Sequence, residues 1–265
     1  MGFPAKLDEK VIGIAFDGVG LGDDGNIWGG EFLICDFADY KRYSHFEYVQ
    51  MPGGDTATKN PWRMAVSYLY KYYGTSFLDL NLAFLKNIPD FEIDLVIKML
   101  EKNINCPLTS STGRFFDAVA ALTNICTQSS FHAEAPMRLE AAIDKNTSAV
   151  YNFETGTVIK PENIIKGIVN DLQNGITQEV ISAKFHNTII NVIFEVANKI
   201  RQTEGLNKVV LSGGSFQNSF LLEKTENLLS DNGFEVFAQE NIPANDGGLA
   251  LGQLAIAAKR RQIND

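Results

Sequence analysis

The sequence predicts an α/β protein in which a helical segment separates two sheet-forming regions. Short apolar runs broken by glycine and aspartate occupy residues 1–59 and indicate strands. Apolar residues at helical spacing fill residues 60–205, and strand and helix patterns alternate over residues 206–265. With 265 residues, 45% of them hydrophobic, the chain can bury one substantial core. We therefore expect a single lobe, residues 1–265, built from these three regions.

The first region predicts an antiparallel meander. An apolar run over residues 11–16 stops at an Asp-Gly pair, and a loop rich in glycine and aspartate follows over residues 20–25. Strand patterns resume over residues 27–36 and 43–51. Consecutive strands joined by short turns favour antiparallel pairing.

The second region predicts helices. Asn60 followed by Pro61 is typical of a helix start, and Gly74 ends the apolar stripe that follows. Another helix opens at Pro161, and the longest spans residues 177–204. A further helix is indicated by a stripe that we expect to face the core, made of Leu95, Val96, Met99 and Leu100.

The last region predicts two strands, each followed by a helix. A strand over residues 208–211 ends in a Gly-Gly turn before a helix over 216–229, and a strand over 234–238 precedes a helix over 246–259. Such strand–helix repeats favour parallel pairing. An antiparallel meander, a helical insertion and β-α-β-α together form the layout of one lobe of an actin-like, ribonuclease H-like fold with a mixed sheet.

Composition argues against several classes of partner. The net charge is -9, and the closest approach to a basic cluster is Lys259-Arg260-Arg261 at the end of a predicted helix. The cysteines, Cys35, Cys106 and Cys126, form no C-x-x-C pair and predict reduced thiols. No apolar run reaches the ~18–20 residues of a membrane span, and residues 1–6 have no signal-peptide core. We expect a cytoplasmic protein that binds neither nucleic acid nor membrane.

The three histidines give no catalytic or metal motif. His45, His132 and His186 share no ligand spacing, and no serine or cysteine lies in a nucleophile elbow. His186 follows Phe185 on the longest predicted helix, and we expect it at the edge of the core rather than as a base. The sequence therefore carries no self-contained catalytic constellation.

Two turns at strand ends are candidates for ligand binding. Ser212, Gly213 and Gly214 lie between a strand and a helix that runs past Asn218. Glycine amides at a helix start favour phosphate, although an ordinary β-α turn is the alternative. Asp246 opens the last predicted helix, where a carboxylate is either a cap or a ligand. Both turns follow adjacent strands, and ligands bind at that edge of open α/β sheets.

Three further charged residues each have two open interpretations. Asp17 ends the first strand and is either a turn residue or, with Asp246, a ligand of a divalent metal beside a nucleotide. Arg114 and Asp117 stand three residues apart at a predicted helix start. Either they form a surface ion pair, or Asp117 holds a ribose and Arg114 lies near phosphate.

Seven segments spread over nearly the whole chain resemble the HypF carbamoyltransferases of hydrogenase maturation. The Trp28-Gly29-Gly30-Glu31 and Pro61-Trp62-Arg63 blocks favour this family over the related O-carbamoyltransferases and tRNA threonylcarbamoyl transferases. The resemblance is carried by residues 15–32, 51–55, 61–65, 110–120, 185–187, 211–218 and 245–253.

The resemblance implies an actin-like ATPase (ASKHA) lobe that binds ATP or a carbamoyl-adenylate between two lobes. In the family, the carbamoyl group passes to a C-terminal cysteine thiol of the partner HypE, and dehydration there gives the source of hydrogenase cyanide. By position, Asp17 and Asp246 would be catalytic carboxylates that ligate a divalent metal, zinc or iron. The implied nucleotide contacts are Gly18, Gly113, Arg114, Asp117, Ser212, Gly213, Gly214 and Asn218.

The sequence departs from the family pattern in two places. Upstream, family members carry an acylphosphatase-like module, zinc fingers, a carbamoyl-adenylate-forming module and a metal-binding histidine pair, none of which is in this sequence. Two carboxylates alone would underfill a zinc or iron site. Where the family has Tyr-Glu-Gly-x-Ala-Ala, residues 131–136 read Phe-His-Ala-Glu-Ala-Pro. This replaces a glycine near the ligand, and Pro136 is expected to alter the local helix.

Three functions are therefore open. The chain is one lobe of a carbamoyltransferase that is inactive without the upstream modules. Alternatively, it is a truncated, non-catalytic fragment that binds a nucleotide or a partner, or it is an O-carbamoyl or tRNA threonylcarbamoyl transferase. An apolar face is expected where the upstream modules would pack, which predicts self-association into a homo-oligomer.

Overall fold

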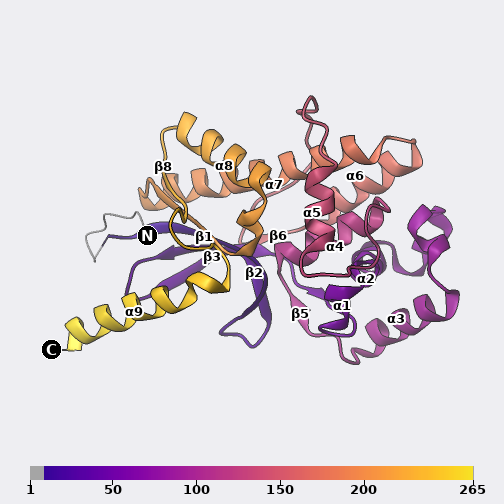
Figure 1. The fold of residues 1–265 in the computed structure, drawn as a ribbon, viewed down its shortest axis with the longest axis horizontal. Helices are drawn as coiled ribbons and strands as arrows, with labels where there is room; N and C mark the ends of the chain where they lie inside the picture. The colour runs from indigo at the N-terminus through magenta and orange to yellow at the C-terminus, as the bar shows by residue number, and fades with distance from the viewer. Residues whose placement is uncertain (1–8, 265) are drawn as a thin grey trace.

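A computed structural model describes residues 9–264 and shows one mixed sheet with helices packed against it (Figure 1). Residues 1–6, which were expected to lack a signal-peptide core, lie outside the described residues. The strands follow the order β4-β5-β2-β1-β7-β8, and β3 pairs with both β2 and β6. The strands are β1 (Val11–Leu21), β2 (Ile27–Cys35), β3 (Tyr40–Phe46), β4 (Val49–Gln50), β5 (Leu108–Thr109), β6 (Val158–Ile159), β7 (Lys208–Ser212) and β8 (Glu235–Phe237).

The pairing of the strands confirms the predicted mixed sheet. β1 is antiparallel to β2, with Ile12 opposite Ile34, and β2 is antiparallel to β3. On its other side β1 is parallel to β7, with Ile12 opposite Val209, and β7 is parallel to β8. The antiparallel meander and the parallel β-α-β-α unit therefore meet at β1.

The helices also follow the predicted order along the chain. The longest one, α7, ends at Gly205, as expected from the sequence. Four 3-10 turns are η1 (Gly74–Leu80), η2 (Ala83–Asn87), η3 (Gly214–Gln217) and η4 (Asp246–Gly248). The α-helices are α1 (Thr56–Lys59), α2 (Pro61–Tyr73), α3 (Asp90–Lys102), α4 (Thr112–Leu122), α5 (Glu134–Ala141), α6 (Glu162–Gln173), α7 (Gln178–Glu204), α8 (Ser219–Asp231) and α9 (Leu249–Asn264).

The core lies between the sheet and α4, which is buried along its whole length. Alternate residues of β1, from Ile12 to Phe16, face the helices, and the Phe16 ring stacks on Phe216 with centroids 5.7 Å apart. Phe116 of α4 meets Phe185 of α7 edge to face, with centroids 4.8 Å apart. Phe46 of β3 links β1 to α4, because its ring centroid lies 6.0 Å from those of both Phe16 and Phe115. The aromatic contacts thus hold the first turn of α4 near Asp17, where the candidate site residues lie.

The middle region is not helical throughout, because it also supplies two short strands. β5 pairs with β2 and β4, and β6 pairs with β3. Each contains two residues, which is too short to leave an alternating pattern in the sequence. Backbone hydrogen bonds thus join the helical region to the edge of the sheet.

The expectation that Leu95 faces the core was wrong. Its side chain is 51% exposed, and α3 instead buries Ile93, Val96, Ile97 and Leu100. Both sets fit helical spacing, so the sequence alone does not choose between them. The choice is made by packing, because α3 lies against α2.

The helix predicted over residues 216–229 is divided in two at Asn218. The Asn218 side chain accepts a hydrogen bond from the Leu221 backbone N–H at 2.8 Å, so Asn218 is the cap of α8 and not an internal helix residue. Residues before it form the separate turn η3. The last predicted helix is divided in the same way into η4 and α9.

The C-terminal helix α9 exposes apolar side chains. In Figure 1 it lies below β1 and β3, whereas α7 and α8 lie above them. Leu254 is 67% exposed, and Leu249, Leu251 and Ile256 are also exposed. Within residues 9–264, no helix combines the length and apolar character that crossing a bilayer requires.

Candidate functional site

A cavity of about 1190 Å³ lies between residues 17–19 of β1, helices α4 and α5, and the turns after β7 and β8. Its volume is sufficient for a nucleotide-sized ligand. Two of the predicted site residues, Ser212 and Gly213, are not among the residues that line the cavity. The others all line the cavity: Asp17, Gly18, Gly113, Arg114, Asp117, Gly214, Asn218 and Asp246.

Gly213 joins the two strand-end turns to β1. Its φ is +102°, and a Cβ at this position would come within 2.2 Å of the Phe16 carbonyl oxygen. Its N–H donates to the Ala244 carbonyl oxygen at 3.1 Å, which links the turn after β7 to the turn after β8. Ser212 Oγ accepts a hydrogen bond from Gln239 Nε2 at 3.2 Å. Gly213 therefore holds the turns after β7 and β8 together and against β1.

Asp17 was expected to end the first strand or to lie in a turn, but β1 continues to Leu21. Asp17 instead lies within β1, where the pairing with β2 shifts register between Phe16 and Gly20.

The Asp17 carboxylate lies beside Gly214. A Cβ on Gly214 would come within 3.0 Å of Asp17 Oδ1 and within 4.0 Å of the Asn245 Cβ. The Gly18 N–H donates to Asp17 Oδ1 at 2.6 Å. The absence of a side chain on Gly214 thus keeps open the space between Asp17 of β1 and the turn that carries Asp246.

Asp246 is not the helix cap that one interpretation proposed. The residue before it, Asn245, caps the turn by accepting the Gly247 N–H at 3.0 Å. The Asp246 carboxylate is exposed, and Asp246 lines the cavity. Its side chain is therefore available to a ligand.

The start of α4 is held to β1 at Asp17 and Gly18 by hydroxyl groups. Ser111 Oγ lies 2.6 Å from the Asp17 carbonyl oxygen and 2.7 Å from that of Gly18, and it caps α4 by accepting the Arg114 N–H. Thr112 Oγ1 donates to the Gly29 carbonyl oxygen at 2.8 Å. These contacts hold the first turn of α4 against the cavity. Sequence reasoning did not assign these hydroxyl groups a role.

Arg114 and Asp117 form a buried ion pair, so the surface-pair interpretation was wrong. Arg114 Nε lies 2.9 Å from Asp117 Oδ2, and the two side chains are 10% and 3% exposed. Burial raises the pKa of Asp117 to about 6, although Arg114 and His132 favour the charged form. A buried carboxylate of this kind at a cavity wall is a candidate acceptor for ligand hydroxyl groups.

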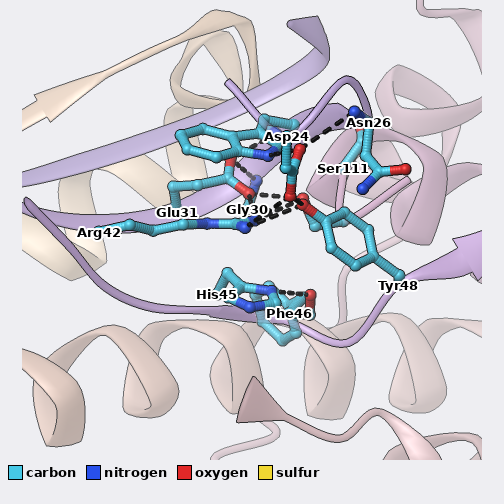
Figure 2. A network of polar contacts seen from close by, with 12 residues as sticks. Asp24, Asn26, Gly30, Glu31, Arg42, His45, Phe46, Tyr48 and Ser111 are labelled. Atoms are coloured by element: carbon cyan, nitrogen blue, oxygen red, sulfur yellow. Dashed lines mark hydrogen bonds and ion pairs between the residues drawn. The ribbon is translucent and has the colours of Figure 1, made fainter. Parts of the chain in front are cut away.

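A second polar network supports the backbone of β2 at Gly29 and Gly30 (Figure 2). Buried Glu31 accepts the N–H groups of Gly29 and Gly30 at 2.5 and 2.7 Å, and Arg42 Nη2 at 2.8 Å. Arg42 also stacks over the Trp28 ring, with its guanidinium carbon 3.9 Å from the ring centroid. The network holds Gly29 where its carbonyl oxygen meets α4.

Asp24 closes this network at its exposed end (Figure 2). Burial acts to raise its pKa, but hydrogen bonds from Tyr48, Asn26 and Trp28 outweigh burial and lower the pKa to about 2. Asp24 therefore stays charged at neutral pH. The Trp-Gly-Gly-Glu block has a structural role here, because it lies outside the cavity lining.

Residues 9–264 do not complete a zinc or iron site. Across the part of the chain that the structure describes, no group of three or more His, Cys, Asp or Glu side chains is arranged to hold a metal ion. Asp17 and Asp246 supply two carboxylates at one cavity, whereas a structural zinc site has four protein ligands. Any metal bound here would need further ligands from the substrate or from another module.

The segment that departs from the family pattern forms one edge of the cavity. His132, Ala133 and Pro136 line it. Ala133 has a φ of +60°, a conformation that glycine adopts without strain. Pro136 was expected to alter the local helix, but α5 forms around it. Pro136 lies in the first turn, where a backbone N–H would have no acceptor within the helix, so the proline removes no helical hydrogen bond.

Replacing Ala133 by glycine is expected to raise the free energy of unfolding by about 0.5–1 kcal/mol. Glycine removes the left-handed strain, and this gain exceeds the extra chain entropy of the unfolded state. Urea denaturation followed by circular dichroism measures the change. The matched control is Ala141→Gly at an exposed helical position of α5, which should lower stability. If Ala133→Gly and Ala141→Gly changed the free energy of unfolding in the same direction, the backbone at Ala133 would not be strained.

Several cavity residues had no signal in the sequence. Lys59 comes from the end of α1, and Met137 and Glu140 come from α5. Glu140 also accepts the Phe220 N–H at 3.1 Å, which ties α5 to α8. Their roles depend on tertiary contacts between segments that no local pattern relates.

Comparison with known proteins gives consistent matches. Residues 13–253 match a family model described as carbamoyltransferase, Kae1-like domain, second subdomain. The chain is 36% identical over 253 residues to a probable carbamoyltransferase HypF of Methanocaldococcus jannaschii, covering 93% of this chain and 32% of that protein. It is 37% identical over 257 residues to carbamoyltransferase HypF of Rhodobacter capsulatus, covering 96% of this chain and 33% of that protein. The chain thus spans about a third of the length of these relatives.

Solved structures agree with the sequence matches. A crystal structure of full-length HypF in a phosphate- and nucleotide-bound form superposes with a TM-score of 0.89 at 42% identity, covering 96% of this chain and 40% of that one. The structure of HypF from T. kodakarensis gives a TM-score of 0.86 at 28% identity, covering 96% of this chain and 34% of that one. The predicted α/β lobe with a mixed sheet is therefore confirmed.

Proposed function

This chain belongs to the carbamoyltransferase HypF family, and from that premise we propose that it is the nucleotide-binding lobe of a carbamoyltransferase. The proposed ligand is ATP or a carbamoyl-adenylate, and the proposed acceptor is a cysteine thiol on a HypE-type partner protein. Because the chain spans about a third of its relatives' length, carbamoyl transfer is expected to require the upstream modules of the family.

One observation carries this proposal. Asp17, Asp117, Asn218 and Asp246 come from four separate segments, and all line one cavity. Two glycines, Gly18 and Gly214, also line this cavity and expose their backbone to it. Glycine allows close approach of a phosphate, and the carboxylates suit hydroxyl groups or a phosphate-bound cation. This arrangement supports nucleotide binding better than it supports an ordinary pair of β-α turns.

In the proposed reaction, the chain's residues bind and orient the activated carbamoyl group. The acceptor thiolate attacks the carbamoyl carbon, a C–S bond forms, and the bond from that carbon to the phosphate oxygen breaks. AMP leaves with the electron pair of that bond. The ion pair of Arg114 with Asp117 would hold the nucleotide at the α4 side of the cavity, with Asp117 as the ribose acceptor.

A divalent metal would neutralise phosphate charge in this site. Asp17 and Asp246 are the proposed carboxylate ligands in this chain. The remaining ligands would come from phosphate oxygens or from the histidine pair of the upstream module.

The proposed partners are the upstream modules of the same family and the thiol acceptor protein. The exposed leucines of α9 give the upstream modules an apolar surface on which to pack. In their absence the same surface would favour self-association, so the homo-oligomer stays a prediction. The relatives reported above are HypF proteins, so the O-carbamoyl and threonylcarbamoyl alternatives gain no support from them.

Isothermal titration calorimetry on the chain tests nucleotide binding, with ATP, adenosine and inorganic phosphate as separate probes. We expect saturable ATP binding, with adenosine and phosphate each weaker because each fills part of the cavity. Zinc and, under anaerobic conditions, Fe(II) should bind weakly in the absence of ATP. No heat from ATP at millimolar concentration would refute the proposed nucleotide site, and tight zinc binding without ATP would refute the incomplete metal site.

A further inference from the structure

His186 on α7 is a buried histidine that none of the roles above uses. It was expected at the edge of the core, but it is 0% exposed and packs edge to face against Phe116 and Phe220. Burial lowers the pKa of His186 to about 4, so the imidazole is neutral at physiological pH. A neutral imidazole has one N–H donor and one acceptor nitrogen, and its two neighbours must match this pattern.

The surroundings of Nδ1 decide where the proton lies. His186 Nδ1 is 2.8 Å from the Ser182 carbonyl oxygen, which can only accept. The Ser182 hydroxyl is 3.4 Å from Nδ1, but it donates its hydrogen to the Leu139 carbonyl oxygen at 2.5 Å. Both neighbours of Nδ1 are therefore acceptors. Nδ1 carries the proton, and Nε2 presents a lone pair.

The Nε2 lone pair of His186 meets the side-chain amide of Asn218. The Asn218 Nδ2 lies 2.9 Å from Nε2, and the Asn218 Oδ1 accepts the Leu221 N–H at 2.8 Å. Because a backbone N–H can only donate and Nε2 can only accept, the orientation of the amide is determined at both ends. Asn218 is 9% exposed and lines the cavity. The second Nδ2 hydrogen is left for a ligand.

We infer that His186 is a positioning residue, which holds the Asn218 amide so that its free N–H is presented to an acceptor atom of the bound nucleotide. This inference rests on the proposed nucleotide site. A chain of hydrogen bonds runs from α5 through α7 to the cap of α8. It joins Leu139 to Ser182, Ser182 to His186, and His186 to Asn218. Without the Nε2 acceptor, the helix cap alone would hold Asn218, and the amide would be free to turn about its remaining contact.

Three variants test the inference by ATP calorimetry. His186→Leu removes the acceptor at similar volume and is expected to weaken ATP binding about fivefold, the equivalent of one hydrogen bond. His186→Gln offers an oxygen to Asn218 Nδ2 and should restore most of the affinity. Asn218→Ser keeps a cap for α8 but removes the amide. Adding His186→Leu to the Asn218→Ser variant should then cause no further loss of ATP affinity.

The result that would overturn the inference is an equal loss of ATP affinity from His186→Leu in both backgrounds, because His186 would then act without Asn218. The inference would also be overturned if His186→Gln folded but did not restore ATP affinity. Thermal denaturation of each variant separates these outcomes from misfolding.

Nitrogen NMR of the imidazole supplies a readout that does not depend on ATP. We expect a protonated Nδ1 and an unprotonated Nε2 that persist to pH 5, with the Asn218 side-chain amide resonances shifted in His186→Leu. A histidine protonated at Nε2 would overturn the inference whether or not ATP binds. If the chain bound no ATP but His186 showed the expected tautomer, the proposed function would be refuted. The hydrogen bond between His186 and Asn218 would still be supported.

Discussion

Replacing Gly213 by alanine is expected to lower the free energy of unfolding by about 4 kcal/mol. The backbone at Gly213 has φ +102° and ψ 159°, a region that only glycine occupies without strain. The added methyl group would also come within 2.2 Å of the Phe16 carbonyl oxygen, so β7 and β1 would have to separate. For a domain of this size the melting temperature should fall by roughly 10 °C. Urea denaturation measures the loss.

Gly205→Ala is the matched control for this substitution. Gly205 also has a positive φ, +71°, but no atom lies within 4 Å of a Cβ at that position. Its substitution should cost about 1 kcal/mol, from backbone strain alone. Equal losses at Gly205 and Gly213 would show that the close approach of the turn to β1 does not matter.

Replacing Gly214 by alanine is expected to weaken ATP binding about 30-fold, or roughly 2 kcal/mol, with the fold retained. The new methyl group would lie 3.0 Å from Asp17 Oδ1 and project between the two turns that border the cavity. It meets no backbone atom closely, so the protein can fold by moving the Asp17 carboxylate. The displaced carboxylate and the occupied space would both act against the ligand. Calorimetry with ATP gives the affinity.

Gly252→Ala controls for the loss of a glycine. Gly252 lies on α9, and nothing lies within 4 Å of a Cβ there. Alanine should leave ATP affinity unchanged and stabilise the helix slightly. Unchanged ATP affinity in folded Gly214→Ala would place the nucleotide elsewhere and remove the main support for the proposed site.

Much of the architecture could be predicted from the sequence because local patterns determine it. The apolar run that stops at Asp17, the long stripe of α7 and the two strand–helix units each leave a periodic signal. Their order fixed the antiparallel and parallel pairings of β1. Where two stripes were equally periodic, as around Leu95, only contact with α2 decided which face is buried.

The candidate site was predicted in part. The glycine turn and the carboxylates were visible because they occur at strand and helix ends, which have characteristic residues. The burial of the Arg114–Asp117 pair was not visible, because spacing of three residues fits a surface pair equally well. The contributions of Lys59 and Glu140 depend on how α1 and α5 pack, and no short-range pattern reports that.

The two-residue strands β5 and β6 have a consequence for how a ligand enters. They join the helical region to β2, β4 and β3 by main-chain hydrogen bonds, while Ser111 ties α4 to β1 at Asp17 and Gly18. The β1 and α4 sides of the cavity are therefore held together by the sheet and by the cap of α4. Under the proposed function, we expect ligand access to depend on how a neighbouring module packs over the cavity and not on motion of α4 against β1.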